Sequence, residues 1–158
     1  MTTQKKASAE AKLHELGLQL PNAPAAAAAY VTFVRSGNFA FTSGHLPVKM
    51  DGTRMVGRLG TEMAADQGIE AAKLTALNLL ATIKANLGSL DKVKRVVKIV
   101  GLINSSPDFT DLAKVMNGCS DLMAQVFGDA GKHVRVTAGV ASLPFNVPIE
   151  IDVTLEVE

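Results

Sequence analysis

Residues 133–157, HVRVTAGVASLPFNVPIEIDVTLEV, decide the fold of this chain. The stretch divides at a Leu-Pro step into two segments in which apolar residues recur at every second position. That period of two is typical of half-buried strands, and the prolines between the segments lack the N–H that a ladder requires. Arg135 lies out of phase with the valines around it, and Glu150 and Asp152 alternate with apolar residues in the second segment. We therefore expect a cation and several carboxylates to face away from the core on two neighbouring strands. A functional site and an ordinary solvated sheet face would both produce this pattern.

The preceding residues supply further strands and two long helices, which apolar periodicity, capping residues and glycines delimit. The expected elements are a flexible end at 1–7, a helix capped by Ser8 and running to Leu16, a hairpin within 30–42 that turns at Gly37-Asn38, an edge segment at 54–60, a helix from an N-cap at Thr61 to Leu87, a strand at 93–103 and a helix from Phe109 to Phe127. This order indicates an α+β fold with both long helices on one face of a sheet. The other face, partly apolar and partly charged, is expected to be covered by other subunits of a homo-oligomer, with sites between chains.

The composition narrows the classes of function. A chain of 158 residues forms one domain with a sizeable core. Its net charge of +1 and its aromatic content of 4% make nucleic acid an unexpected partner, because charge and stacking both favour such binding. Cys119 is the single cysteine, and the sequence contains neither a long apolar run nor an apolar signal core. These features predict a cytoplasmic protein.

Several familiar sequence motifs are absent. The chain has no GxGxxG, GxxxxGK[ST], HExxH, CxxC or GxSxG pattern, and its three histidines and one cysteine do not have metal-ligand spacing. We therefore expect no metal site, and the family resemblance described below implies chemistry that needs no organic cofactor either.

Four residues are candidates for a site, each with an ordinary structural alternative. Tyr30, the only tyrosine, is also typical of amphipathic packing, and Gly44 suits either close approach of a ligand or a plain turn. His45 is an acid/base candidate by type, but no other histidine pairs with it by spacing. Asn117 is a poor residue for the middle of a helix, which is only a weak sign of function.

Four stretches carry a more specific signal: AAYV at 28–31, TSGHLPV at 42–48, Phe109 to Asn117, and the closing set of Arg135, Leu143-Pro144, Glu150 and Ile151. Together they resemble the RidA/YjgF family, the reactive-intermediate deaminases formerly called endoribonuclease L-PSP. The closing set is the most specific, because its members stand at the family's spacing. The resemblance extends from Pro24 to the C-terminus, and the segment KVMNGCSDLMAQVFG and the extra N-terminal helix are similar to the longer, YjgF-like branch. We therefore assign residues 1–23 to an N-terminal extension with a short helix and residues 24–158 to a RidA/YjgF-like domain.

The resemblance implies a chorismate-mutase-like fold of the bacillus type and a homotrimer with ligand clefts between subunits. It also implies hydrolysis of 2-iminoacids or their enamine tautomers, such as 2-iminobutanoate, to 2-ketoacids and ammonia. Arg135 matches the family arginine that pairs with the substrate carboxylate, and Glu150 matches the glutamate that handles the attacking water. Further substrate contacts are implied for Tyr30, Ser43, Gly44, Asn117 and Thr137.

One position departs from the family pattern. Thr137 stands where many members carry a cysteine, and Val136 replaces a small polar residue before it. If the family uses the side chain at this position, the substrate range or the rate changes. Two rival functions stay open: a non-catalytic trimer that senses a metabolite in the same cleft, and the endoribonuclease of the older name. The near-neutral charge and the scarcity of aromatic residues argue against the latter.

Overall fold

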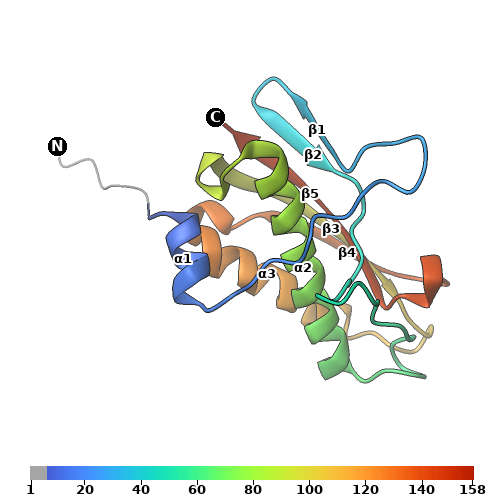
Figure 1. Ribbon diagram of the computed structural model, residues 1–158. Coiled ribbons are helices and arrows are strands. Elements are labelled where there is room, and N and C mark those ends of the chain that lie inside the picture. The colour runs from blue at the N-terminus through green and yellow to red at the C-terminus, as the bar shows by residue number, and fades with distance from the viewer. Residues whose placement is uncertain (1–6) are drawn as a thin grey trace.

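A mixed five-stranded sheet forms the centre of the protein, which the computed structural model describes over residues 7–158 (Figure 1). Its strands are β1 (Phe33–Ser36), β2 (Phe39–Thr42), β3 (Val93–Asn104), β4 (Val134–Val140) and β5 (Ile149–Val157). They lie in the order β1-β2-β5-β3-β4, with β3 and β4 parallel and the other neighbours antiparallel. The hairpin predicted at Gly37-Asn38 is confirmed between β1 and β2. The flexible end predicted for residues 1–7 lies, apart from Ala7, outside the described residues.

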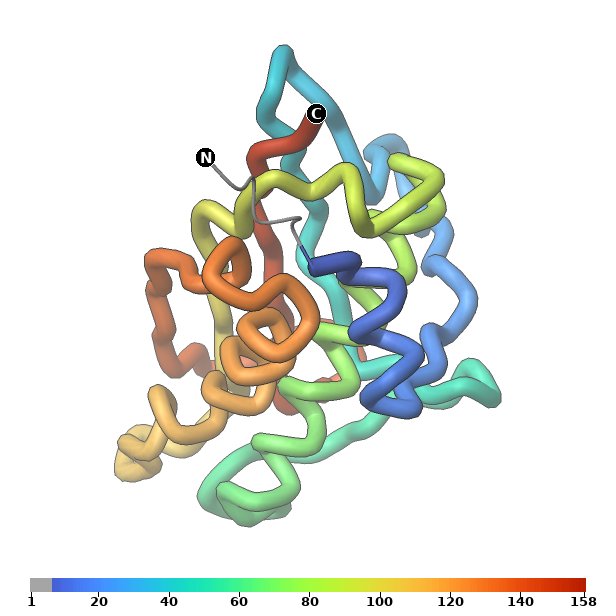
Figure 2. The backbone as a smooth tube through the Cα atoms, turned by 90° about the vertical axis from the view of Figure 1, so that its left-hand side faces the viewer, coloured from blue at the N-terminus to red at the C-terminus, as the bar shows by residue number. Residues whose placement is uncertain are grey.

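Three helices cover one face of this sheet (Figures 1 and 2). They are α1 (Ala9–Glu15), α2 (Ala65–Leu87) and α3 (Leu112–Phe127), supplemented by short 3₁₀ turns η1 (Leu90–Lys92), η2 (Gly128–Gly131) and η3 (Pro144–Asn146). The core lies between the sheet and the helices, and its largest fully buried side chains include Leu79, Leu80, Ile83, Ile99, Ile103, Met116, Met123, Ile149, Ile151 and Leu155. The predicted α+β class, with two long helices on one face of the sheet, is confirmed. None of the helices in the described part of the chain is long and apolar enough to cross a membrane.

Two glycines bring α3 close to its neighbours. A Cβ atom at Gly118 would overlap the backbone carbonyl of Ile69 in α2, and one at Gly101 in β3 would overlap the thioether of Met116. Both positions therefore allow an approach that a larger residue would block. The polar side of α3 is thereby held above the edge strand β4.

The N-terminal helix is fastened to the far end of α2. Ser8 Oγ accepts a hydrogen bond from the Ala11 amide, as predicted for its cap. Glu10 accepts from the Leu90 amide at 2.9 Å and pairs with Lys84 at 2.8 Å. The side chain of Leu13 is buried in the main core. The extension therefore contributes to the same core as the rest of the chain.

The long helix α2 starts at Ala65, so the prediction of an N-cap at Thr61 is wrong. The backbone carbonyl of Arg58 accepts hydrogen bonds from the amides at 61–63, which closes a turn there before the helix begins. The side chain of Gln67 then accepts from the Ala64 amide at 2.9 Å and satisfies one donor at the helix start. The helix ends as predicted at Gly88, whose φ of 84° is left-handed.

Three other predicted boundaries also differ from the structure. Helix α3 starts at Leu112 and not at Phe109, because the Phe109 amide closes a turn on the Ser106 carbonyl. The predicted edge segment at 54–60 makes isolated bridges in place of a strand. The first strand starts at Phe33, so Tyr30 lies in a bend before it.

Strands β4 and β5 are not neighbours, which contradicts the prediction, because β3 lies between them. The parallel connection through α3 places β4 beside β3 at the sheet edge. The predicted orientation of β4 is also wrong: Val134 and Val136 are 64% and 50% exposed, whereas Arg135 points toward α3. The reason is that α3 presents polar side chains at this edge and not an apolar surface.

The sheet face opposite the helices is partly apolar and partly charged, as predicted. Strand pairing and exposure place Val34, Phe39, Phe41, Lys98, Val134, Val136, Glu150 and Asp152 there. The apolar members are large side chains of a kind that subunit interfaces usually cover.

Candidate functional site

The predicted site residues fall into two groups on opposite faces of the sheet. Tyr30, Ser43, Gly44 and Glu150 line one cavity of about 220 Å³, which we call the Glu150 cavity. Arg135 and its partners border a second hollow of about 310 Å³, which we call the Arg135 pocket.

The Glu150 cavity forms where the end of β2 meets the start of β5. His45 exchanges two backbone hydrogen bonds with Ile151, of 2.8 and 3.0 Å, which places Gly44 directly against Glu150. A Cβ atom at Gly44 would lie 2.5 Å from Glu150 Oε1. The glycine predicted to admit a ligand therefore leaves room for the glutamate carboxylate.

Burial, and then the negative charge of Asp152, raise the pKa of Glu150 above its usual range. Burial also raises the pKa of Asp152, and Lys98 opposes that shift. Burial and a neighbouring negative charge both disfavour the charged form of the Glu150 carboxylate. A carboxyl group whose pKa is raised toward neutrality can accept a proton from water or return one to a leaving group.

Ser43 holds the segment that carries Tyr30. Its hydroxyl donates to the Val31 carbonyl at 2.6 Å, and its amide donates to the Thr32 carbonyl at 3.0 Å. Tyr30 is 52% exposed and lines the cavity. The Ser43 side chain thus positions the cavity wall.

His45 is 3% exposed and both ring nitrogens have partners. Nδ1 lies 2.7 Å from the Ser43 carbonyl, so it carries the proton, and Nε2 then accepts from the Thr82 hydroxyl at 2.7 Å. Burial lowers the pKa of His45, with the Ser43 hydrogen bond opposing the shift. The neutral ring links the cavity wall to α2 and has no nitrogen left for chemistry, so the structure does not support His45 as an acid/base group.

Arg54 and Phe145 also line the Glu150 cavity, although the sequence analysis did not identify them as site residues. The guanidinium carbon of Arg54 lies 4.0 Å from the ring centre of Phe145. Arg54 follows a turn and Phe145 lies in the loop before β5, so no motif or spacing links them. Only the fold brings them together.

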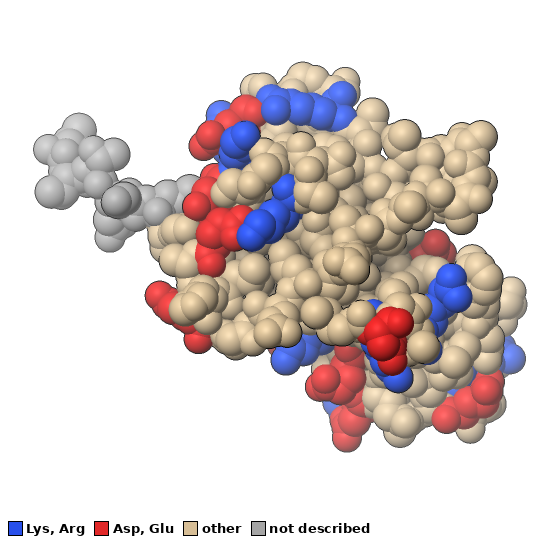
Figure 3. All heavy atoms as spheres, viewed as in Figure 1, with Lys and Arg blue, Asp and Glu red and all other residues tan. Residues whose placement is uncertain are grey.

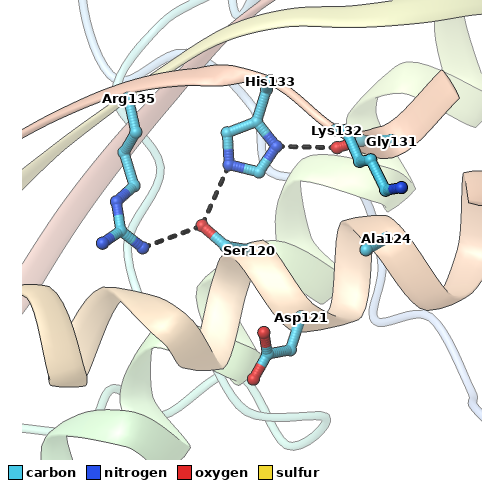
Figure 4. Close-up of a pocket in the computed structure, with 7 residues that line it drawn as sticks. All are labelled: Ser120, Asp121, Ala124, Gly131, Lys132, His133 and Arg135. Carbon is cyan, nitrogen blue, oxygen red and sulfur yellow. Dashed lines mark hydrogen bonds between the residues drawn. The ribbon is translucent and has the colours of Figure 1, made fainter. Parts of the chain in front are cut away.

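The Arg135 pocket has a network of polar side chains between β4 and α3 (Figure 4). Arg135 Nη1 donates to Asn117 Oδ1 at 2.9 Å and to Ser120 Oγ at 3.0 Å, and Nη2 donates to the Ala113 carbonyl at 3.4 Å. His133 Nδ1 donates to the Gly131 carbonyl at 2.7 Å, so Nε2 can accept from the Ser120 hydroxyl at 2.9 Å. The guanidinium is therefore held in one orientation before any ligand arrives.

Thr137 lies on the same side of β4 as Arg135, and its hydroxyl is buried without a hydrogen-bond partner among the described residues. Cys119 is fully buried on α3, and burial raises the pKa of its thiol to about 12, although the charge of Arg135 acts in the opposite direction. A thiol with that pKa stays protonated and is not a nucleophile. Ser120 and His133, which complete the network, were not predicted as site residues.

Within one chain, Arg135 and Glu150 do not meet. In β3, Ile99 pairs with Arg135 and Leu102 pairs with Glu150, and residues three apart on a strand face opposite sides. Two strand spacings and three residue rises separate their Cα atoms by about 14 Å. The structure thus brings together three predicted residues with Glu150 and two with Arg135, but it does not bring the two groups together.

The described residues also show how metal ligands and charged side chains are distributed. Within residues 7–158 there is no cluster of three or more His, Cys, Asp or Glu side chains suited to a metal ion. Lys and Arg are interspersed with Asp and Glu over the face shown in Figure 3, without a continuous basic band.

Comparison with known proteins places the chain in a family. Residues 10–155 match the family described as "YjgF/chorismate mutase-like, putative endoribonuclease". Protein TCP17 of Trypanosoma cruzi is 45% identical over 147 residues, which cover 92% of each chain.

Solved structures agree with this match. Atu1372 of Agrobacterium tumefaciens, a protein of unknown function, is 41% identical with a TM-score of 0.87, over 96% of this chain and 94% of that one. Escherichia coli TdcF, solved with bound serine, is 26% identical with a TM-score of 0.58, over 89% and 97%. The family predicted from the closing set of residues is confirmed, and this chain belongs to the YjgF/chorismate mutase-like family.

Proposed function

We propose that the protein hydrolyses 2-iminoacids, or their enamine tautomers, to 2-ketoacids and ammonia. Water adds to the imine carbon, one C–O bond forms, and the C–N bond of the resulting carbinolamine breaks. The nitrogen leaves as ammonia after it gains a proton, and the hydroxyl proton is lost as the ketone forms. A protonated imine is already a good electrophile, so the chemistry requires only positioning and proton transfer.

The observation that carries the proposal is the setting of Glu150. A half-buried carboxyl group with a raised pKa lies in a small cavity beside Tyr30 and Gly44. In its ionised form it is suited to orient and deprotonate the attacking water. In its protonated form it is suited to deliver the proton that releases the nitrogen. Both steps use the same group in sequence, as acid/base catalysis requires.

Arg135 is the proposed anchor for the substrate carboxylate. Its Nη1 atom is occupied by Asn117 and Ser120, and one N–H of Nη2 reaches Ala113. The Nε–H and the remaining Nη2 N–H lie along one edge of the plane, where a carboxylate can accept two parallel hydrogen bonds. Serine in the related TdcF structure carries such a carboxylate.

The site is proposed to form between protomers of a homotrimer. Arg135 lies on the edge strand β4 and Glu150 on the opposite sheet face, so a single chain does not bring them together. A second copy that packs its β4 edge near the Glu150 cavity would complete the site. The exposed apolar residues Val34, Phe41 and Val136 offer the surface for that contact.

A sensing protein would use the same cleft without turnover. The side chain of Thr137 favours this candidate, because it stands where many relatives have a cysteine and its hydroxyl is buried without a partner among the described residues. Ribonuclease activity, suggested by the family description, has less support, because the net charge is only +1 and the face shown in Figure 3 has Lys and Arg interspersed with Asp and Glu. RNA cleavage that survives purification and disappears in Glu150→Gln would favour it.

The direct test is ammonia release from imines generated in situ by an amino-acid oxidase. We expect acceleration over buffer by the wild type and loss of that acceleration in both Arg135→Ala and Glu150→Gln. Arg135→Lys keeps the charge but not the planar fork, so it should recover little activity. Absence of acceleration by the wild type, together with thermal stabilisation by 2-ketoacids, would replace the deaminase with the sensor.

A further inference from the structure

A second cation lies in the cavity that contains Glu150. Arg54 lines this cavity and follows a turn closed by the Lys49 amide on the Thr53 carbonyl at 2.8 Å. The Met55 amide donates to the Pro47 carbonyl at 3.0 Å and fixes the next residue as well. The backbone that carries Arg54 is therefore tied down on both sides.

The guanidinium of Arg54 is stacked but not neutralised. Its carbon lies 4.0 Å from the centre of the Phe145 ring, an arrangement in which the ring takes the flat face of the cation. Within residues 7–158, the Arg54 side chain has neither an ion-pair nor a hydrogen-bond partner. Stacking leaves the N–H groups in the guanidinium plane, so they stay available for a planar anion.

Phe145 is held in place by a strained and well-anchored loop. Phe145 and Asn146 have φ values of 58° and 54°, the only non-glycine residues with positive φ in the described chain. Buried Asn104 donates to Asn146 Oδ1 at 2.9 Å and to the Val147 carbonyl at 3.2 Å, and the Gly57 amide donates to the Asn146 carbonyl at 2.8 Å. These bonds stabilise a conformation that is otherwise unfavourable, a kind of strain that often marks ligand sites.

Arg54 and Glu150 act as separate groups in one cavity. Burial and Asp152 raise the pKa of Glu150, which is the reverse of what an ion-pair partner would do. The positive charge of Arg54 is therefore left for a ligand. The cavity volume of about 220 Å³ is smaller than the roughly 300–1,000 Å³ of drug-sized sites, which favours a metabolite of a few carbon atoms.

We propose that Arg54, backed by Phe145, binds a second anionic group of the ligand, so that the preferred ligands are 2-imino or 2-oxo dicarboxylates of four or five carbons. This inference rests on the proposed function, in which Arg135 of another protomer takes the first carboxylate. Arg54 is then the residue that selects the substrate side chain, and Glu150 faces the reacting carbon between the two anchored ends.

The test compares two probes of equal chain length, 2-oxoglutarate and 2-oxopentanoate, by calorimetry on the full chain. Because an exposed arginine should form hydrogen bonds with the second carboxylate, we expect 2-oxoglutarate to bind about tenfold more tightly than 2-oxopentanoate. Arg54→Gln should abolish this preference, because it should weaken the binding of 2-oxoglutarate more than the binding of 2-oxopentanoate. Lys49→Gln removes one positive charge from the same loop without altering the cavity lining, so it should keep the preference. Thermal unfolding checks that each variant is folded.

The outcomes separate this inference from the proposed function. The inference is overturned if the wild type binds both probes with equal affinity, or if Arg54→Gln lowers the affinity for both probes by the same factor. Either result would overturn it even if imines are hydrolysed. A preference for 2-oxoglutarate that Arg54→Gln abolishes supports the inference, even in a protein without turnover. If imines are hydrolysed, 2-iminoglutarate should be preferred over 2-iminopentanoate in kcat/KM by the same factor.

Discussion

Replacement of Gly44 by alanine tests whether this glycine exists to make room for Glu150. The added Cβ would lie 2.5 Å from Glu150 Oε1 and 2.8 Å from its Cδ and Cγ. Ordinary contacts between such atoms are about 3.5–4.0 Å, so the carboxyl group must move by roughly 1 Å. Gly44 itself has no left-handed backbone angle, so the effect comes from the contact and not from the backbone.

The expected consequences differ in size for stability and for rate. The clashing atoms belong to the end of a flexible, half-buried side chain that can move away, so Gly44→Ala should cost no more than about 1 kcal/mol of unfolding free energy, the low end of the range for overpacking, and lower Tm by about 2–4 °C. Displacement of a catalytic group by about 1 Å can reduce kcat by about 100-fold. The assay is ammonia release from an in situ imine, combined with thermal unfolding of the same samples.

The double variant Gly44→Ala, Glu150→Gln is the internal control. If Gly44→Ala acts by displacing Glu150, it should slow Glu150→Gln little further, because the two changes affect the same group. Gly139→Ala is a matched control, since its Cβ would lie 2.7 Å from Ser105 Oγ, away from the Glu150 cavity. Full activity of Gly44→Ala, or losses that multiply in the double variant, would refute the reasoning.

Three further predictions concern the pKa of Glu150, the loop at Phe145 and the exposed sheet face. Because the pKa of Glu150 is raised, the ionised form appears only as pH rises past the usual glutamate range, so the acid limb of the kcat/KM profile should lie above about pH 4.3. Asp152→Asn removes one cause of the raised pKa and should move the acid limb to lower pH. An acid limb that does not move in Asp152→Asn would contradict this prediction. Asn104→Ala removes two hydrogen bonds that hold the loop at Phe145, so unfolding free energy should fall by about 2–3 kcal/mol and Tm by roughly 4–12 °C; a Tm within a degree of wild type would contradict this. Val34→Glu places a charge on the exposed apolar face and should convert the proposed trimer to monomers in light scattering without lowering the helix content; a variant that assembles like the wild type would remove that face from the proposed interface.

Much of the fold follows from local signals in the sequence. The period-two segments at the C-terminus, the hairpin at Gly37-Asn38 and the helix end at Gly88 all depend on residues close together in the chain, and the structure confirms each. Helix starts were less predictable, because Gln67 and the carbonyl of Arg58 take over the role expected of Thr61.

The errors concern relations between distant segments. The sequence does not reveal that β3 inserts between β4 and β5, since strand order depends on how α3 crosses over the sheet. It also misplaces Arg135, because alternation with valines identifies two faces of an edge strand without revealing which one lies under polar α3. The pairing of Arg54 with Phe145 was missed for the same reason, as only tertiary structure brings those loops together.

The most direct measurement of the central claim mixes two inactive variants. If Arg135 of one protomer completes the Glu150 cavity of its partner, refolded mixtures of Arg135→Ala and Glu150→Gln should contain intact sites at some interfaces. With equal amounts and random assembly, about a quarter of the sites would carry both native groups, so about a quarter of wild-type ammonia release should return. Mixtures as inactive as the separate variants, under conditions where subunit exchange is verified by mass, would contradict a site shared between chains.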